Sequence, residues 1–367
     1  MKKVILTYLT IITLHVHSQV LEAISYGGIT RTYMYYKPTD WNQNQQLPLL
    51  VVLHGLTQTG GGIMDITQFN QLAETNNFIV CYPNGINNAW NANMNVSVST
   101  ADDKGFLEAL INNFQQNFNT NPNKQYLCGF SNGGFMSHKM ACESSECFAA
   151  IATVSGNMSD TTYANCNPLY QPAVLHIHGT LDAIVPYSGG STTGVSVDQT
   201  IEKWADFLSC DPSPTSVNMP NTSLTDLSSP ERITYSNCTS PLELIKITGA
   251  GHQWPGISTL VGGAGIINMD FYSPQIIWDF LSTKSCQTNA LTEDKMLSLQ
   301  IFPNPANTLL NINSDELVDY QIFNVLGLKI ASGTMKNDLN IENLESGVYQ
   351  INLTLNKENK SFKFIKN

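Results

Sequence analysis

Positive charge is scarce in this 367-residue chain. The sequence carries 18 Lys and Arg residues against 29 Asp and Glu residues, which gives a formal net charge of −11 and a pI near 5.0. Proteins that bind nucleic acids or anionic membrane surfaces display a concentrated basic patch, and the sequence contains no such cluster. The composition therefore argues against nucleic acid and membrane surfaces as partners, and we interpret the acidity as a contribution to solubility.

Long apolar segments are also missing beyond the N-terminus. No later stretch reaches the roughly 18 continuous apolar residues that a membrane-spanning helix needs. The chain begins with two lysines and a short apolar run, and Val16 and Ser18 supply the small side chains that precede a signal-peptidase cut before Gln19. This pattern predicts a signal peptide over residues 1–18 and an exported mature protein with no transmembrane anchor.

The eight cysteines match no zinc-binding spacing, and export would place them in an oxidising compartment where disulfides persist. Two bridges are favoured. Cys142 and Cys147 stand five residues apart after a predicted helical stretch, and Cys210 and Cys238 flank a loop rich in Pro, Ser, Thr and Asn. We expect each of these pairs to form a disulfide.

The remaining cysteines fall into two groups. Cys166 and Cys286 could pair with each other, but the sequence leaves their connectivity open. Cys81 and Cys128 lie inside apolar strand-like segments, where a free cysteine behaves as a small hydrophobic residue. We expect these two to be buried thiols.

Apolar runs of strand length alternate with helical patterns through most of the chain. After an opening hairpin at residues 24–36, runs typical of strands buried on both faces of a parallel sheet occupy residues 47–53, 78–83, 125–128, 149–154, 173–179 and 242–248. Helices are expected near residues 64–75, 102–118, 133–142, 197–209 and 273–281, the last of them capped by Ser273. The alternation predicts an α/β fold with a mostly parallel, doubly wound sheet.

The character of the chain changes after Cys286. Residues 287–297 are polar and are interpreted as a linker. From residue 298 onward, short segments that alternate apolar and polar residues are separated by Asn and Gly turns. We therefore predict an α/β domain over residues 19–286 and a small all-β sandwich over residues 298–367.

One pentapeptide, Gly129-Phe130-Ser131-Asn132-Gly133, joins a predicted strand to a predicted helix. A serine in that position needs a turn so sharp that the residues two places away must be glycine, which is the pattern of a nucleophile elbow. An ordinary loop in a glycine-rich chain could carry the same pattern by chance. For Ser131 to be a nucleophile, the rest of the chain must supply a base and an acid.

Two residues meet that requirement at the ends of later strands. Asp182 follows the run 173–179, and His252 follows the run 242–248. Taken singly, Asp182 could be a turn-forming aspartate and His252 a satisfied loop histidine. Their order along the chain, Ser then Asp then His, is that of α/β-hydrolases, whose sheets place such groups beyond strand ends. We therefore predict a catalytic triad of Ser131, Asp182 and His252.

An acyl-transfer site also needs backbone N–H groups that bind the developing oxyanion. Asn132, which follows the serine, is one expected donor. Leu56, in the loop after the strand 49–53, is the other, with Thr57 as the alternative. Thr57 is also expected to border the substrate pocket.

Other histidines and two tryptophans receive less specific predictions. His54 competes for the role of base, but its place on the loop that carries Leu56 favours a structural hydrogen bond. His176 and His178 alternate along a predicted strand and are expected to have core or turn roles. Trp90 and Trp254 are candidate walls of the substrate pocket, although either could instead pack in the core.

Several motifs taken together resemble a known family. They are Val51-Val52-Leu53-His54-Gly55, Gly129-Phe130-Ser131-Asn132-Gly133-Gly134, His178-Gly179-Thr180 with Asp182 and Val185-Pro186, and Gly251-His252-Gln253-Trp254-Pro255-Gly256. Over about residues 22–285 the chain resembles the secreted esterases grouped as polyhydroxybutyrate depolymerase-like and feruloyl or acetyl xylan esterases, similar to carbohydrate esterase family 1. The resemblance implies an α/β-hydrolase fold and a serine carboxylesterase that requires no metal or organic cofactor.

The resemblance is weak for the substrate. Feruloyl or acetyl esters of plant polysaccharides rank ahead of polyesters of the polyhydroxyalkanoate type. A peptidase is disfavoured by the family resemblance, although triad chemistry does not exclude amides. The alternative from another class is a non-catalytic surface binding protein that retains the fold.

The C-terminal region resembles a type IX secretion sorting domain. The motifs that carry this resemblance are Phe302-Pro303-Asn304-Pro305, Asn324-Val325-Leu326-Gly327, Leu344-Glu345-Ser346-Gly347-Val348-Tyr349 and Lys363-Phe364-Ile365-Lys366. It implies translocation across a Gram-negative outer membrane, with the type IX machinery as partner. The alternative is a β module that binds carbohydrate, but its aromatic residues mostly fall in alternating runs and fit a core better.

Overall fold

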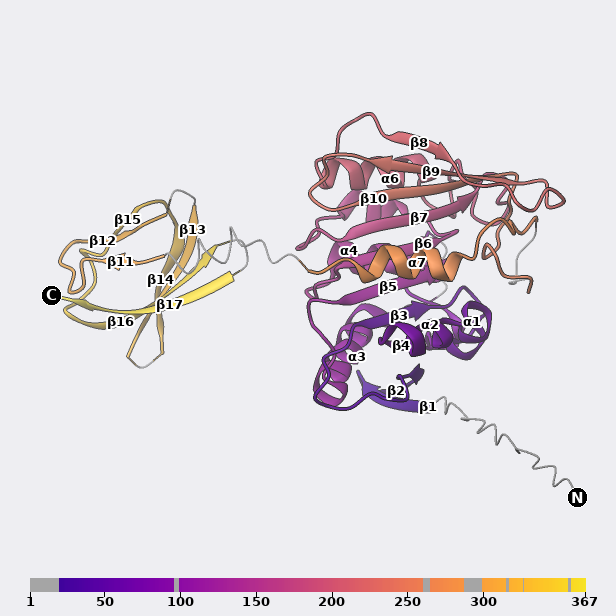
Figure 1. Cartoon of the computed structure of the whole chain (residues 1–367). Coiled ribbons are helices and arrows are strands. Elements are labelled where there is room, and N and C mark those ends of the chain that lie inside the picture. Colours follow the sequence, from indigo (N-terminus) through magenta and orange to yellow (C-terminus); the bar gives the residue numbers. More distant parts are fainter. Residues whose placement is uncertain are drawn as a thin grey trace, which may run out of the picture. The chain divides into compact units, whose positions relative to one another are not determined.

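The computed structural model describes residues 20–95, 99–259, 265–286, 299–314, 317–325, 327–355 and 358–367. The chain divides into two compact units, residues 1–286 and 287–367 (Figure 1). The predicted signal peptide, residues 1–18, and the predicted linker, residues 287–297, lie outside the described residues. Within the described part, no helix combines the length and the apolar character needed to cross a membrane.

The first unit is built on a ten-stranded sheet (Figure 1). In spatial order its strands are β1 (Val20–Tyr26), β2 (Ile29–Tyr36), β4 (Ile79–Pro83), β3 (Leu49–Leu53), β5 (Gln125–Phe130), β6 (Ala150–Val154), β7 (Ala173–Gly179), β10 (Leu242–Thr248), β9 (Ser229–Tyr235) and β8 (Thr215–Asn218). The central strands β4, β3, β5, β6, β7 and β10 pair with one another in parallel. The outer strands β1 and β2 on one side, and β9 and β8 on the other, pair antiparallel. The mostly parallel sheet predicted from the apolar runs is confirmed.

Helices cover both faces of this sheet (Figure 1). Three helices contribute to the apolar core on one face: α3 (Asp103–Phe118), α4 (Asn132–Glu143) and α6 (Val197–Phe207). Three others contribute to the core on the opposite face: α1 (Gly60–Thr67), α2 (Phe69–Asn76) and α7 (Ser273–Ser282). Successive residues of β3 enter opposite cores, with Leu49 and Val51 in the first and Leu50 and Val52 in the second. Burial on both faces explains why the central strands are continuous apolar runs.

Three local predictions need correction. Residues 211–237, predicted as a loop, contain both β8 and β9, and the exposed edge strand β8 carries no apolar run by which to recognise it. The helix expected over residues 64–75 is two helices separated by Gln68, whose φ of 53° is left-handed. Finally, α7 begins at Ser273 itself, whose hydroxyl donates to the carbonyl of Pro255 instead of capping the helix.

The cysteines confirm one predicted bridge and correct the others. Cys210 bonds to Cys238, as predicted. The predicted pairing of Cys142 with Cys147 is wrong, and so is the suggested pairing of Cys166 with Cys286. The observed disulfides are Cys142–Cys166 and Cys147–Cys286. Cys81 and Cys128 are buried free thiols, as expected.

Tertiary packing decides these pairings. The short helix α5 (Asp160–Asn165) packs against α4, and Cys166 caps its C-terminus beside Cys142. Cys147 and Cys286 meet near the start of β5, where the Cys147 carbonyl accepts from the side chain of Gln125 and the Cys286 N–H donates to the carbonyl of Asn123. These approaches depend on the folded sheet and are not encoded in cysteine spacing.

The second unit contains two antiparallel sheets. One has the strand order β11 (Ile301–Phe302), β12 (Leu309–Ile312), β15 (Asp338–Asn340), and the other β14 (Lys329–Met335), β13 (Val318–Asn324), β16 (Gly347–Leu355), β17 (Glu358–Lys366). Leu310 of the first sheet and Ile322, Ile351 and Phe364 of the second share one apolar core. Tyr349 stacks on the buried Phe364, so these aromatic rings contribute to packing.

Candidate active site

Ser131 occupies a strained turn between β5 and α4. Its φ of 52° and ψ of −119° are rarely adopted by a residue with a side chain. A Cβ on Gly129 would lie 2.1 Å from the carbonyl oxygen of Gly133, and a Cβ on Gly133 would lie 2.2 Å from the carbonyl oxygen of Leu53. Both glycines are therefore required, for the steric reason that the sequence pattern suggested.

The predicted acid and base lie on neighbouring loops. Because β7 and β10 are adjacent and parallel, the loops that follow them leave the same edge of the sheet, and the N–H of Leu181 donates to the carbonyl of Ala250 at 2.9 Å. Nδ1 of His252 and Oδ2 of Asp182 lie 2.7 Å apart, and both residues are buried. The other carboxylate oxygen, Oδ1, accepts from the N–H groups of Ile184 and Val185.

The environment of Asp182 keeps its carboxyl group ionised. Burial alone would raise the pKa of Asp182, but hydrogen bonds from His178 and His252 outweigh it and hold that pKa below its usual range. An ionised carboxylate can only accept, so Nδ1 of His252 carries the proton of their shared bond. Nε2 of His252 is then an unprotonated acceptor whenever the ring is neutral.

Ser131 and His252 border the same pocket, which has a volume of about 340 Å³. The residues that line it are Gly55, Leu56, Thr57, Gln58, Met94, Phe130, Ser131, Asn132, Ile184, Val185, Thr192, Thr193 and His252. None of these described residues is an Asp, Glu, Lys or Arg. Leu56 and Ile184 are 43% and 49% exposed, so apolar surface reaches the rim of the pocket.

The two backbone N–H groups predicted as oxyanion donors have no hydrogen-bond partner among the described residues. Asn132 is the first residue of α4, where backbone N–H groups have no partner within the helix. Within the described part of the chain, the N–H of Leu56 has no hydrogen-bond partner either. The alternative donor, Thr57, is excluded because its N–H donates to the carbonyl of Asn88 at 2.8 Å. Thr57 does line the pocket that Ser131 borders.

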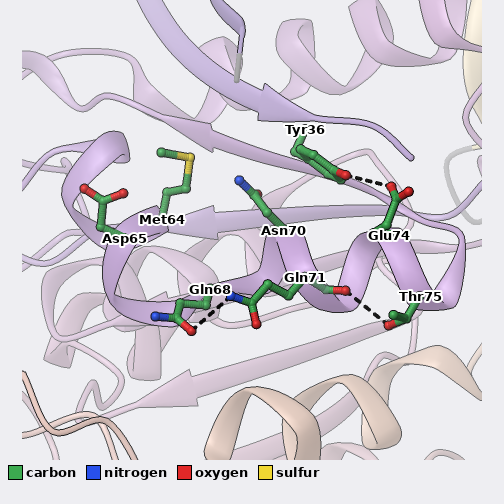
Figure 2. Close-up of a pocket in the computed structure, with 8 residues that line it drawn as sticks. All are labelled: Tyr36, Met64, Asp65, Gln68, Asn70, Gln71, Glu74 and Thr75. Carbon is green, nitrogen blue, oxygen red and sulfur yellow. Dashed lines mark hydrogen bonds between the residues drawn. The ribbon is translucent and has the colours of Figure 1, made fainter. Parts of the chain in front are cut away.

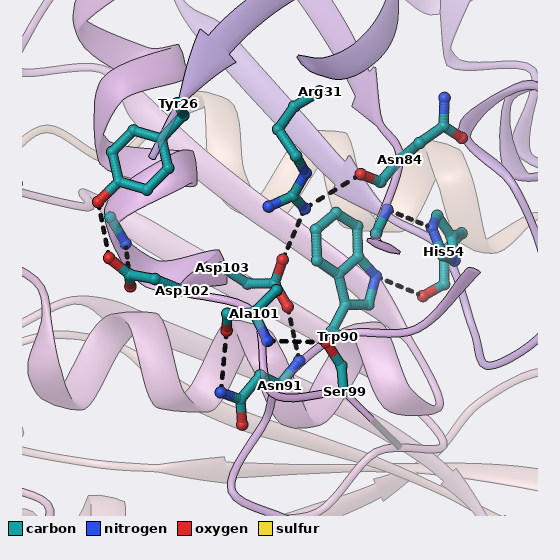
Figure 3. A network of polar contacts seen from close by, with 12 residues as sticks. Tyr26, Arg31, His54, Asn84, Trp90, Asn91, Ser99, Ala101, Asp102 and Asp103 are labelled. Carbon is teal, nitrogen blue, oxygen red and sulfur yellow. Dashed lines mark hydrogen bonds and ion pairs between the residues drawn. The ribbon is translucent and has the colours of Figure 1, made fainter. Parts of the chain in front are cut away.

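The two tryptophans predicted as pocket walls are in the core. Trp90 and Trp254 are both fully buried, and neither lines the pocket. Trp254 packs with its ring centroid 6.0 Å from that of Phe130. The indole N–H of Trp90 donates to the carbonyl of His54 at 2.9 Å (Figure 3). The sequence pattern around Trp90 and Trp254 does not indicate whether their rings face the pocket or the core.

His54 has the structural role that its loop position suggested. Its Nε2 accepts from the N–H of Gly85 at 3.0 Å, and its Nδ1 lies 2.7 Å from the carbonyl of Gly55. Burial lowers the pKa of His54 to about 4. Both ring nitrogens are engaged, so this neutral imidazole is not available as the base.

A buried series of hydrogen bonds, the histidine chain, extends behind Asp182. Its members in spatial order are Trp204, His138, Thr153, His176, His178 and Val185, and the five successive links measure 3.1, 3.3, 2.7, 3.1 and 2.8 Å. The core roles expected for His176 and His178 are correct. Nothing in the sequence signalled that His138 and Thr153 would join them, because that depends on how α4, β6 and β7 pack.

The direction of every link in the histidine chain follows from its two ends. The indole of Trp204 can only donate, and the carbonyl of Val185 can only accept. Each imidazole is therefore neutral, with Nδ1 accepting and Nε2 donating. Burial lowers the pKa of His138 to about 3 and that of His176 well below its usual value. Nε2 of His178 also lies 3.4 Å from Oδ2 of Asp182, so the donating end faces the carboxylate.

A second hollow, of about 520 Å³, lies between β2 and the helices α1 and α2 (Figure 2). It shares no lining residue with the pocket at Ser131, and its side chains are mainly amides and carboxylates, among them Asp65, Gln68, Asn70 and Glu74. The hydroxyl of Tyr36 donates to Glu74 at 2.6 Å. Among the described residues, no group of three or more His, Cys, Asp and Glu is arranged to hold a metal ion.

The chain matches two family models. Residues 27–254 match the family described as "Putative esterase", and residues 300–367 match the secretion system C-terminal sorting domain. The chain is 24% identical to the probable feruloyl esterase C of Aspergillus niger over 258 residues, which cover 68% of this chain and 83% of that protein. It is 25% identical to the bifunctional acetylxylan esterase/xylanase XynS20E of Neocallimastix patriciarum over 264 residues, which cover 70% of this chain and 33% of that protein.

A solved structure has the same fold as the first unit. The acetyl xylan esterase from Aspergillus awamori superposes with a TM-score of 0.52 at 16% sequence identity, and the match covers 72% of this chain and 99% of that one. At this identity the likeness concerns the fold alone. It identifies the first unit as an α/β-hydrolase fold.

Proposed function

The chain belongs to the esterase family whose model matches residues 27–254, and we propose that it is a serine carboxylesterase with Ser131, His252 and Asp182 as its catalytic triad. The observation that carries this proposal is the 2.7 Å hydrogen bond between His252 Nδ1 and Asp182 Oδ2, at the pocket that Ser131 also borders. That bond leaves Nε2 of His252 as the proton acceptor for a serine hydroxyl.

The proposed reaction begins with acylation. The Ser131 hydroxyl attacks the ester carbonyl while Nε2 of His252 takes its proton, and the negative charge of Asp182 stabilises the imidazolium that forms. The carbonyl oxygen becomes an oxyanion, which the N–H groups of Leu56 and Asn132 bind. His252 then protonates the leaving alcohol, and the acyl group remains on Ser131.

Hydrolysis of the acyl-enzyme completes the cycle. His252 takes a proton from a water molecule, the resulting hydroxide attacks the acyl carbonyl, and the same two N–H groups bind the second oxyanion. Collapse of this intermediate returns the proton to Ser131 and releases the acid. Apart from the ester and the water molecule, each step uses groups that this chain itself supplies.

We propose feruloyl or acetyl esters of plant polysaccharides as the substrates. The relatives named as a feruloyl esterase and an acetylxylan esterase support this ranking. The lining of the pocket also fits a neutral acyl group, because none of its described residues is an Asp, Glu, Lys or Arg. The runner-up is a polyester, favoured by the exposed side chains of Leu56, Leu181 and Ile184, which would suit an apolar polymer surface.

The C-terminal sorting domain makes this a protein that is secreted or carried to the cell surface. We propose that residues 1–18 act as a signal peptide and that the type IX machinery recognises the domain at residues 298–367. A carbohydrate-binding role for the second unit is less well supported, because Phe364 lies in its core and Tyr349 stacks on it.

Replacement of the nucleophile tests the proposed function. We expect Ser131→Ala to lower kcat/KM for p-nitrophenyl acetate by about 10³-fold or more while the unfolding midpoint stays close to that of the wild type. Ser137→Ala is a matched control, because Ser137 is a buried serine on the same helix whose hydroxyl donates to the carbonyl of Gly133. Full activity of Ser131→Ala, or a folded wild-type protein that cleaves no ester, would contradict the proposal and favour a non-catalytic binding protein.

A further inference from the structure

Trp90 contacts both segments that carry the proposed oxyanion donors. It lies in the loop between η1 (Ile86–Asn88) and α3. Its indole N–H donates to the carbonyl of His54, two residues before Leu56, at 2.9 Å (Figure 3). Its backbone N–H donates to Oδ1 of Asn132 at 2.7 Å, and its backbone carbonyl accepts from Nδ2 of Asn132 at 3.1 Å. One residue therefore joins the loop after β3 to the N-terminus of α4.

The loop after β3 also depends on the neighbours of Trp90. The N–H of Gly85 donates to Nε2 of His54, and the carbonyl of Asn88 accepts from the N–H of Thr57. These bonds lie on either side of Leu56 in the sequence. The segment 84–91 thus acts as the template against which the position of the Leu56 N–H is set.

A buried ion pair anchors this template at both ends (Figure 3). Nη2 of Arg31 lies 2.6 Å from Oδ1 of Asp103 and also donates to the carbonyl of Asn84 at 3.2 Å. Oδ2 of Asp103 accepts from the N–H of Asn91 at 2.7 Å. The side chains of Arg31 and Asp103 are only 2% and 0% exposed, so water does not compete for these contacts. Trp90 is therefore presented by a segment that is fixed before and after it.

We propose that Trp90, together with the side chain of Asn132, positions the two donors of the oxyanion hole. The inference rests on the proposed function, in which the N–H groups of Leu56 and Asn132 bind the oxyanion. These donors belong to different elements, and an oxyanion binds both only when their separation and direction are correct. Bonds from one buried residue to both elements set that separation. Trp90 touches no reacting atom and is a positioning residue.

A pair of tryptophan variants separates positioning from core packing. Trp90→Phe keeps an aromatic ring but removes the N–H that binds His54. We expect kcat for p-nitrophenyl acetate to fall about 10- to 100-fold with KM within about threefold, because the loss concerns the transition state. The inhibition constant of phenylboronic acid, which becomes tetrahedral on an active serine, should rise by a similar factor.

Trp254→Phe is the matched control. Trp254 is also fully buried and packs against Phe130, yet its indole N–H has no hydrogen-bond partner among the described residues. We expect kcat and the boronic acid inhibition constant to remain within about threefold of wild type. An equal loss in both tryptophan variants would show that ring packing is responsible and would overturn the inference.

A second variant tests the same link from its other side. Asn132→Ala keeps the backbone N–H of residue 132 and the indole bond to His54 but removes both bonds to the Trp90 backbone, so kcat should again fall about tenfold or more. It decides the matter if Trp90→Phe does not fold. Folded Trp90→Phe and Asn132→Ala proteins with kcat and inhibition constant within threefold of wild type would refute the positioning role. Absence of any esterase activity in the wild type would instead refute the proposed function.

Discussion

The two sides of Ser131 are held in place by different means. On the acid–base side, Asp182 and His252 follow the adjacent strands β7 and β10 and bond directly to each other. On the oxyanion side, Leu56 and Asn132 follow the adjacent strands β3 and β5, but the bonds that relate them pass through Trp90, which belongs to a third segment. The sheet alone therefore brings Asp182 to His252, whereas the relation between the proposed oxyanion donors also depends on the segment that carries Trp90.

The supports behind the two sides also differ in charge. The histidine chain is neutral and turns its donating end toward Asp182, whose lowered pKa favours the ionised carboxylate. The template of the oxyanion side is anchored by Arg31 and Asp103, whose charges compensate each other. This difference suits the proposed mechanism, in which one side holds an ionised carboxylate in the resting protein and the other binds a charge that develops only during the reaction.

The largest effect within this comparison is expected at the direct contact between acid and base. Asp182→Asn keeps the shape of the side chain, but its amide can donate to Nδ1 of His252 and so favours the imidazole tautomer that cannot accept the Ser131 proton. We expect kcat for p-nitrophenyl acetate to fall about 10³- to 10⁴-fold. Steady-state kinetics of this variant measure the effect.

A suitable control for Asp182→Asn is Asp279→Asn, which makes the same chemical change on the exposed face of α7. Its kcat should equal that of the wild type within about twofold. If Asp182→Asn folds normally and loses less kcat than Trp90→Phe, the contact between Asp182 and His252 contributes less to kcat than the positioning of the oxyanion donors. That result would contradict the expected order of the two effects.

A smaller effect is expected from a break in the histidine chain. Thr153→Val is close to isosteric and removes the hydroxyl that donates to Nδ1 of His176 at 2.7 Å. A buried acceptor then loses its donor, so the free energy of unfolding should fall by about 1–3 kcal/mol. Urea denaturation of the purified protein measures this change, and kcat should fall by less than tenfold because the triad itself is intact.

Thr153→Ser sharpens the test, because it retains the hydroxyl and loses only a methyl group. We expect it to keep more of the unfolding free energy than Thr153→Val does. Equal stability of the two variants would mean that the hydrogen bonds of the Thr153 hydroxyl add nothing measurable to the free energy of unfolding and that Thr153 contributes through packing alone.

Features set by the central strands could be predicted from the sequence, whereas features set by loop packing could not. The central strands were recognisable because burial on both faces leaves continuous apolar runs, and the parallel sheet follows from their alternation with helices. Ser131, Asp182 and His252 were predicted, and are proposed, as a triad because each stands just beyond such a run. The 2.7 Å contact between Asp182 and His252 is where adjacency of β7 and β10 would place it.

Contacts that depend on loop packing could not be predicted in this way. Trp90 and the side chain of Asn132 come into contact only when the segment 84–91 folds against α4, and no periodic pattern in the sequence predicts that contact. For this reason the sequence left open whether Trp90 borders the pocket or packs in the core, and the structure places it in the core. The partner of Cys142 likewise depends on where α5 packs, and the exposed strand β8 has no apolar pattern to reveal it.

The central claim, that Ser131 is a nucleophile activated by His252, is tested most directly by covalent labelling. The folded protein would be treated with a fluorophosphonate, which reacts with activated serines, and the adduct located by peptide mass spectrometry. We expect a single adduct on Ser131 in the wild type, strong loss of labelling in His252→Ala, and no labelling after denaturation. A folded, unlabelled wild-type protein, or an adduct on another serine, would contradict it.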